Sequence, residues 1–287
     1  MGGTHHRYAT VDGQRLFYRE AGPPDAPTLL LLHGFPASSA MFRGLLPLLA
    51  DSWHLIAPDH LGFGLSDAPP ADGFDYTFDA LTDLTAGLLG KIGVDRYAMY
   101  VHDYGAPIGW RLALRDPSAV SAIISQNGNA YAAGLQPEFF RPVFDYWQER
   151  SPATELAVRQ ALTLETTRWQ YVTGVADETL VDPSSWTLDH ALLSRPGNDL
   201  VQLALFGDYA TNPALYPLIQ RYFRDSQVPL LAVWGRADPV FGPAGALAFA
   251  DDLPNAEIHL LDGGHFLLES ALAETATLIR KFLSAVL

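Results

Sequence analysis

Cysteine is absent from this 287-residue chain, and no apolar run approaches the length of a membrane-spanning helix. Without thiols there is no disulfide, no thiolate nucleophile and no cysteine-ligated zinc or iron–sulfur site. The longest apolar runs, such as residues 29–32 and 230–234, are far shorter than the roughly 20 residues that span a bilayer. The first residues also lack the apolar stretch of a signal peptide. We therefore expect no membrane association and a cytoplasmic location.

Basic residues are scarce as well, with 18 Lys+Arg against 32 Asp+Glu and a formal net charge of −14. The acidic excess is spread along the chain, so we expect no nucleic-acid partner. The 48% of hydrophobic residues is typical of a globular protein with a packed core. We assign His5 and His6 to solvated side chains at a polar terminus, or to a cloning remnant, rather than to a metal site. No other cluster has metal-ligand spacing, so no metal or cofactor is expected.

Short apolar segments typical of buried strands alternate with segments whose apolar residues recur at helical spacing. The expected strands are residues 28–33, 53–57, 97–101, 120–124, 228–234 and 256–261. The expected helices are residues 41–50, 77–92, 105–115, 244–250 and 269–286. Apolar strands interleaved with helices predict an α/β fold, with a mostly parallel sheet covered by helices on both faces. Both ends of the chain contribute to this sheet.

Residues 131–223 interrupt the alternation. They are helical in pattern, rich in Tyr and Trp, and contain no clear buried strand. We interpret them as an inserted helical lid, or cap, which divides the α/β core into residues 1–130 and 224–287. No step in charge marks a separate partner-binding module, so the expected partner is a small apolar molecule and the expected assembly is a monomer or homodimer.

In an α/β sheet, functional groups gather on the loops beyond the carboxyl ends of the strands. After the expected strand 97–101 comes His-Asp-Tyr-Gly at residues 102–105, and a helical segment follows directly. A compact polar residue at a sharp strand-to-helix turn, with glycine two residues later, is the layout of a nucleophile elbow. The residue at the apex is Asp103, where the usual elbow has serine.

Five motifs in order make the chain resemble the α/β-hydrolase superfamily. Within it, the chain is similar to the aspartate-nucleophile branch, which contains epoxide hydrolases and the haloalkane and fluoroacetate dehalogenases. The motifs are His-Gly-Phe-Pro at 33–36, Pro-Asp-His-Leu-Gly-Phe-Gly-Leu-Ser-Asp at 58–67, His-Asp-Tyr-Gly at 102–105, Trp-Gly-Arg-Ala-Asp-Pro at 234–239 and Gly-Gly-His-Phe at 263–266. The resemblance covers nearly the whole chain.

This resemblance implies a catalytic triad of Asp103 as nucleophile, His265 as base and Asp238 as the partner of the histidine. The chemistry requires each part: a helix N-terminus keeps a carboxylate ionised, a base activates water, and an acid fixes the tautomer of that base. The backbone N–H groups of Phe35 and Tyr104 are the implied oxyanion hole.

Three other polar residues are expected to be structural. Ser66 half-matches a serine elbow, but no helical segment follows it, so it is not assigned as a nucleophile. His33 and His102 flank the expected pocket and are assigned to hydrogen bonding within their loops rather than to base catalysis.

The reaction depends on what stabilises the leaving group. Epoxide hydrolases use two lid tyrosines to protonate the oxygen, and the offsets of Tyr146 from Asp103 and of Tyr209 from Asp238 are similar to those of this pair. We therefore expect hydrolysis of an epoxide to a vicinal diol through a covalent ester on Asp103, with Tyr146 and Tyr209 as proton donors.

Dehalogenase features are partly missing. Phe35 and Tyr104 stand where haloalkane dehalogenases often have Asn and usually have Trp, and Tyr104 and Pro107 stand where fluoroacetate dehalogenases have two arginines. Trp147 matches a dehalogenase position and keeps that activity as the alternative. The expected substrate contacts are Trp147, Phe35, Tyr104 and Phe266. A carboxyl-ester hydrolase or a small-ligand binding protein on the same fold are further alternatives.

Overall fold

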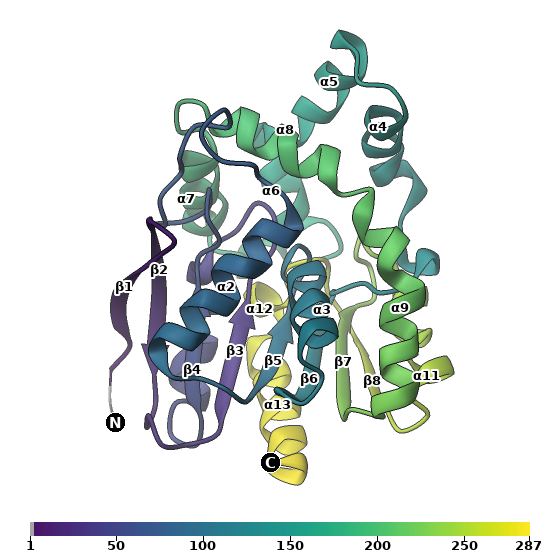
Figure 1. Cartoon of the computed structure of the whole chain (residues 1–287). Coiled ribbons are helices and arrows are strands. Elements are labelled where there is room, and N and C mark those ends of the chain that lie inside the picture. The colour runs from purple at the N-terminus through teal and green to yellow at the C-terminus, as the bar shows by residue number, and fades with distance from the viewer. Residues whose placement is uncertain (1–2) are drawn as a thin grey trace.

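Eight strands form one sheet in the order β1-β2-β4-β3-β5-β6-β7-β8 in the computed structural model, which describes residues 3–287 (Figure 1). β1 and β2 pair antiparallel, β2 also pairs antiparallel with β4, and the other pairings are parallel. The strands are β1 (His5–Val11), β2 (Gln14–Ala21), β3 (Thr28–Leu32), β4 (His54–Pro58), β5 (Tyr97–Val101), β6 (Val120–Gln126), β7 (Leu230–Gly235) and β8 (Glu257–Leu261). The prediction of a mostly parallel sheet that joins both ends of the chain is confirmed.

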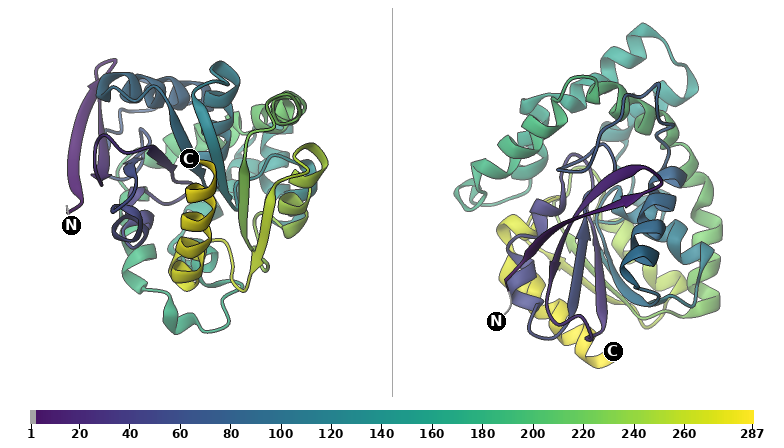
Figure 2. Two further views of the ribbon diagram at one scale, coloured as in Figure 1. Left: turned by 90° about the horizontal axis from the view of Figure 1, so that it is seen from below. Right: turned by 60° about the vertical axis from the view of Figure 1, so that its left-hand side comes forward.

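Helices cover both faces of the sheet, as the two views of Figure 2 show. One face carries α2 (Phe78–Ile92), α3 (Gly105–Arg115) and α9 (Thr211–Ser226), and the other carries α1 (Leu45–Leu49) and α13 (Leu272–Val286). The apolar side chains divide accordingly into two buried clusters, one on each face. The central strands are buried because they are covered on both sides, which explains their continuous apolar sequences.

The remaining helices connect the strands or lie over one end of the sheet. They are α4 (Pro137–Gln148), α5 (Pro152–Arg159), α6 (Leu164–Val172), α7 (Pro183–Leu193), α8 (Asn198–Asp208), α10 (Pro243–Leu247), α11 (Phe249–Asp252) and α12 (Leu267–Ser270). Short 3-10 turns are η1 (Ser39–Phe42), η2 (Ala132–Gly134), η3 (Gln160–Leu162) and η4 (Glu178–Leu180). Helices α4 to α8 lie above the carboxyl ends of the parallel strands, and α9 returns beside α3 (Figure 1).

The hairpin of β1 and β2 was missed by the sequence analysis. Its strands are joined by Asp12 and Gly13, whose φ angles of 47° and 81° are those of a tight hairpin turn. His5 and His6 are the first two residues of β1, and their side chains are exposed.

The predicted helix 105–115 is α3, whereas the predicted helices 41–50, 244–250 and 269–286 are each broken into two shorter pieces. Within residues 3–287, no helix has the length and apolarity needed to span a bilayer.

Candidate active site

Asp103 occupies a sharp turn between β5 and α3. Its φ of 45° lies in the left-handed region, which is uncommon for a residue other than glycine. The turn is crowded: a Cβ at Gly105 would lie 2.2 Å from the Leu32 carbonyl oxygen, and a Cβ at Gly34 would lie 2.2 Å from Asp103 Cβ. The two glycines are therefore required for the close approach of this turn to β3 and the loop that follows it.

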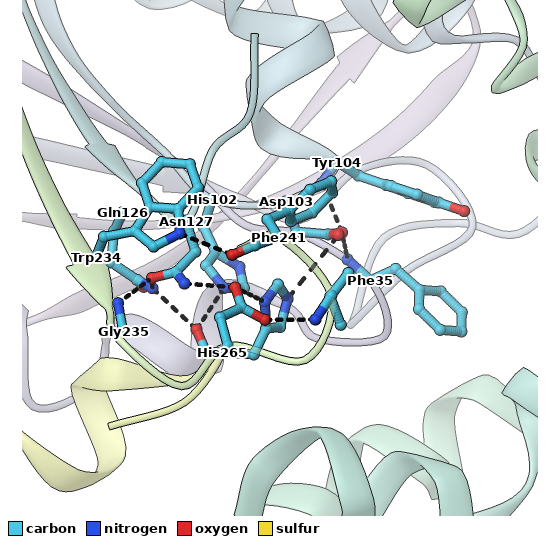
Figure 3. A network of polar contacts seen from close by, with 12 residues as sticks. Phe35, His102, Asp103, Tyr104, Gln126, Asn127, Trp234, Gly235, Phe241 and His265 are labelled. Carbon is cyan, nitrogen blue, oxygen red and sulfur yellow. Dashed lines mark hydrogen bonds and ion pairs between the residues drawn. The ribbon is translucent and has the colours of Figure 1, made fainter. Parts of the chain in front are cut away.

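The two oxygens of Asp103 have different surroundings (Figure 3). Oδ1 accepts hydrogen bonds from the backbone N–H groups of Phe35 and Tyr104, each at 2.6 Å. Oδ2 lies 3.9 Å from His265 Nε2. The residues predicted to form an oxyanion hole thus donate to one carboxylate oxygen, and the other oxygen faces the histidine.

His265 and Asp238 form a buried pair. His265 Nδ1 lies 3.0 Å from Asp238 Oδ2, and neither side chain is exposed to solvent. Asp238 Oδ1 accepts a further hydrogen bond from the backbone N–H of Val240 at 2.7 Å. A carboxylate accepts only from a protonated Nδ1, so the lone pair of the ring lies on Nε2. Among the described residues this Nε2 has no hydrogen-bond partner.

Burial and neighbouring charges shift the pKa values of Asp103 and His265. Burial raises the pKa of Asp103 to about 6, against the opposing effects of His265 and the two backbone N–H groups. Burial lowers the pKa of His265, but the charge and hydrogen bond of Asp238, with the charge of Asp103, outweigh it and raise the pKa above its usual value. The site therefore combines a carboxylate that ionises near neutral pH with a histidine that readily accepts a proton.

Asn127 is a site residue that the sequence analysis missed. It follows β6 with a φ of 51°, and its Nδ2 donates to Asp238 Oδ2. Its Oδ1 accepts from the Gly235 N–H at 3.1 Å and from Gln126 Nε2 at 2.6 Å (Figure 3). Gln126 Nε2 also donates to the His265 carbonyl at 2.9 Å. The pattern that could have found Gln126 and Asn127 is their position within three residues of the end of the expected strand 120–124, at the same edge of the sheet as Asp103.

The polar residues assigned to structural roles make hydrogen bonds with the backbone of their own or neighbouring segments. Ser66 Oγ accepts from the Phe17 N–H at 2.9 Å and donates to the Asp59 carbonyl at 2.7 Å. Burial lowers the pKa of His33 to about 4 and lowers that of His102 well below its usual range. Both histidines are therefore neutral at physiological pH.

Asp103 borders two buried chambers of about 10 Å³ each, which is room for about one water molecule. We call the first the apolar chamber; besides Asp103 it is lined by Phe35, Tyr104, Phe139, Phe140, Val143, Phe206 and Tyr209. We call the second the polar chamber; besides Asp103 it is lined by Pro107, Trp110, Arg111, Asn129, Tyr209, Asn212, Tyr216, Ile219 and Phe241. Tyr209 borders both.

Only some of the predicted lid and substrate residues line the chambers beside Asp103. Tyr209 is beside Asp103, and Phe35 and Tyr104 line the apolar chamber. Tyr146 is buried on α4, and its ring lies under the Arg150 guanidinium at 5.5 Å. The described residues that line the two chambers include neither Tyr146 nor Trp147 nor Phe266.

Trp147 and Phe266 instead pack behind residues of the site. The Trp147 ring stacks on that of Tyr209 with centroids 5.8 Å apart, and its Nε1 donates to the Phe206 carbonyl at 2.7 Å. The Phe266 ring packs edge-to-face with the His265 ring, with centroids 5.1 Å apart, and stacks on the Tyr171 ring, with centroids 3.9 Å apart. Trp147 therefore packs against Tyr209, which lines both chambers, and Phe266 packs against His265.

A larger cavity of about 980 Å³ opens on the surface under α4, α5 and α6. Phe139, Val143 and Phe206 line both this cavity and the apolar chamber. These three side chains therefore separate the surface cavity from the space beside Asp103, and a substrate larger than one water molecule requires their displacement.

The model of the α/β hydrolase fold family matches residues 27–272. The chain belongs to this family. The α/β-hydrolase chain is 43% identical over 268 residues to the uncharacterized hydrolase YNR064C of Saccharomyces cerevisiae, covering 92% of each chain. It is 28% identical to the cis-3-alkyl-4-alkyloxetan-2-one decarboxylase of Shewanella oneidensis, covering 96% of this chain and 87% of the relative.

A shorter match joins this hydrolase to epoxide hydrolase A of Mycobacterium tuberculosis, with 38% identity over 124 residues, 43% of this chain and 38% of the relative. Among solved structures, a loop variant of the haloalkane dehalogenase DbeA from Bradyrhizobium elkanii superposes with a TM-score of 0.78 at 22% identity, covering 99% of this chain and 97% of that one. The epoxide hydrolase CorEH superposes with a TM-score of 0.78 at 20% identity, covering 99% and 100%. These structural similarities establish the fold.

Proposed function

We propose that this hydrolase opens an epoxide with Asp103 and hydrolyses the resulting ester to a vicinal diol. The observation that carries the proposal is that the two oxygens of Asp103 have different contacts. Oδ1 is held by two backbone N–H groups, and Oδ2 faces an unpartnered histidine nitrogen. The partial identity with an epoxide hydrolase supports the same choice.

In the first step, Asp103 Oδ2 attacks a ring carbon. The carbon–oxygen bond of the epoxide breaks, and its electron pair goes to the ring oxygen, which takes a proton from the Tyr209 hydroxyl. Burial, with the neighbouring Tyr216 and Asp103, raises the pKa of Tyr209 well above its usual range, so Tyr209 is protonated before the reaction. The product of this step is a 2-hydroxyalkyl ester of Asp103.

In the second step, His265 Nε2 takes a proton from water, and the hydroxide attacks Cγ of the Asp103 ester. Negative charge develops on Oδ1, where the N–H groups of Phe35 and Tyr104 already donate, so no reorganisation is required. The tetrahedral intermediate expels the diol oxygen, which takes the proton from His265. The remaining acidic proton of Asp103 returns to Tyr209, and the sum is epoxide plus water giving diol.

The halide-binding alternative has weaker support from the geometry. Trp147 matches a dehalogenase position, but its indole N–H is occupied by the Phe206 carbonyl and is not free to bind a halide. Phe35 and Tyr104 bring apolar and phenolic side chains to the apolar chamber rather than further N–H donors. We therefore place dehalogenation second to epoxide opening.

The experiment is a single turnover of styrene oxide in ¹⁸O-water with enzyme in excess. The covalent route gives a first-turnover diol without ¹⁸O, because its new oxygen comes from Asp103, and the label enters Asp103 instead. Label in the first diol would exclude the covalent route. A parallel panel of a bromoalkane, fluoroacetate, a nitrophenyl ester and a substituted oxetan-2-one tests the other chemistries, and turnover of one of these with none of styrene oxide would exclude the proposed substrate class.

A further inference from the structure

The polar chamber contains a donor that this reaction scheme does not use. Asn212, at the start of α9, is 3% exposed and lines the chamber. Its Nδ2 is buried and has no hydrogen-bond partner within residues 3–287. A buried amide N–H without an acceptor is disfavoured. The group is therefore available to an acceptor that comes from outside the protein.

Arg111 fixes the orientation of the Asn212 amide. Arg111 Nη1 donates to Asn212 Oδ1 at 2.7 Å, and Nη2 donates to Thr211 Oγ1 at 2.8 Å. The guanidinium is itself buried and is held by Asp79, which accepts from Nε at 2.8 Å. A flip of the amide would place Nδ2 against this cation, so the side chain keeps Oδ1 on Arg111 and leaves Nδ2 as its free group.

The chamber is rich in donors and small. Its lining includes four residues whose side chains carry hydrogen-bond donors: Arg111, Asn212, Tyr209 and Tyr216. The Tyr216 hydroxyl accepts from Asn129 Nδ2 at 3.1 Å. The volume of about 10 Å³ holds about one water-sized atom. A carboxylate or a phosphate is too large for this space, whereas a single oxygen atom fits.

We propose that Asn212 Nδ2, together with the Tyr209 hydroxyl, binds the oxygen that leaves carbon when Asp103 opens the epoxide. This inference rests on the proposed function and deepens it. Asp103 and Tyr209 border both chambers, so an epoxide attacked by Asp103 can extend into each of them. Its hydrocarbon part lies toward the apolar chamber, and its oxygen lies toward the polar chamber, which contains Asn212. Asn212 transfers no proton. Its amide donates a hydrogen bond that strengthens as negative charge develops on the oxygen, while Tyr209 supplies the proton.

The test replaces the donor without changing its shape. Asn212→Asp keeps an oxygen facing Arg111 and puts an acceptor where Nδ2 was. We expect alkylation of Asp103 by styrene oxide, measured in a single turnover, to slow by about 100-fold, the usual effect of losing one such donor. Hydrolysis of the ester already formed should change by less than about threefold, because the former ring oxygen is then a neutral hydroxyl that gains no charge in this step.

Two further variants separate this role from a structural one. Asn212→Leu removes the donors without adding a charge, and its alkylation rate should also fall. Asn198→Leu removes another buried asparagine side chain, at the start of α8, outside both chambers, and should alkylate at the wild-type rate. An unchanged alkylation rate in Asn212→Asp, an equal loss in Asn198→Leu, or an equal loss in both steps would overturn the role of Asn212. Absence of styrene oxide turnover by the wild-type enzyme would instead overturn the proposed function.

Discussion

Asp103 Oδ2 and His265 Nε2 lie 3.9 Å apart, beyond hydrogen-bond distance, and Nε2 has no other partner among the described residues. The separation keeps the carboxylate oxygen free to attack carbon. It also leaves the histidine lone pair free to deprotonate a water molecule in the second step. The two residues therefore act on successive steps rather than as a hydrogen-bonded pair.

Replacing His265 should separate these steps. His265→Gln removes the base but leaves Asp103 Oδ2 and its N–H contacts in place, so alkylation by styrene oxide proceeds while hydrolysis slows by about 1000-fold or more. Intact-protein mass spectrometry should then find the enzyme increased by the mass of one epoxide, on the peptide that contains Asp103. An unmodified enzyme after prolonged incubation would contradict this assignment, and Asp103→Asn is the control that cannot form the ester.

The pH dependence of alkylation should follow Asp103. Its pKa is about 6 because of burial, and only the ionised carboxylate attacks carbon. The single-turnover alkylation rate should therefore be flat above pH 7 and fall tenfold for each unit below about pH 6. Rates measured from about pH 5 to 8 test this, and a rate independent of pH over that range would contradict it.

Asp103→Asn should yield an inactive but more stable protein. A carboxyl group whose pKa is raised on folding destabilises the folded state once it ionises, so stability falls as the pH rises from about 4 through about 6. Asparagine keeps the carbonyl oxygen for the N–H groups of Phe35 and Tyr104 and carries no charge. We expect a gain of about 2–3 kcal/mol at pH 7.5.

Urea unfolding of the wild type and of Asp103→Asn at pH 7.5 and near pH 4.5 measures this difference. The gain should shrink toward the lower pH, where the wild-type carboxyl is already protonated. A difference that is the same at both pH values would assign the effect to packing rather than to the charge of Asp103.

Replacing Tyr209 should slow the alkylation of Asp103 more than replacing Tyr146. Tyr209 borders both chambers beside Asp103, whereas Tyr146 lies on α4 under Arg150 and outside them. Tyr209→Phe should slow alkylation by about 100-fold, the usual effect of a lost proton donor, and Tyr146→Phe should slow it less. An equal or larger loss in Tyr146→Phe would favour the pairing expected from the sequence and would require the lid to rearrange when substrate binds.

The difference between these tyrosines shows what the sequence could predict about the site. Asp103, Asp238 and His265 follow the carboxyl ends of core strands, and a parallel sheet brings such positions together whatever the loops do. Tyr146 lies on α4, whereas Tyr209 follows the last residue of α8. Both belong to residues 131–223, where a spacing along the chain does not determine which way a side chain points. Tyr216 lines the polar chamber, but nothing in its sequence position sets it apart from the other tyrosines of residues 131–223.

The core strands were predictable for a related reason. Leu29 to Leu32 are fully buried, and a short apolar run is sufficient evidence for such a strand. β1 is mostly exposed and has no such run, so apolar patterning could not reveal it. The turn at Asp12 and Gly13 was the available evidence, because Asp-Gly favours a two-residue hairpin. Asn127 was missed since its role depends on a side-chain contact with Asp238, across neighbouring strands.

Access to Asp103 should depend on Phe139. This side chain lines both the surface cavity and the apolar chamber, and its ring stacks on Trp169 with centroids 6.2 Å apart. The chamber holds about one water molecule, so binding of an epoxide requires an open state in which the side chains between the two spaces have moved. The apparent affinity for substrate is reduced by the fraction of the protein in that open state. Phe139→Ala should raise this fraction.

We therefore expect Phe139→Ala to raise kcat/KM for a bulky epoxide such as trans-stilbene oxide by about tenfold, equivalent to about 1.4 kcal/mol of opening cost. Propylene oxide, which needs less opening, should change little. Phe144→Ala is the matched control, because Phe144 is a partly buried aromatic on the same helix that lines neither space. Steady-state kinetics with both epoxides decide the point. Equal effects of the two substitutions, or a change independent of substrate size, would show that Phe139 packs the lid without controlling entry.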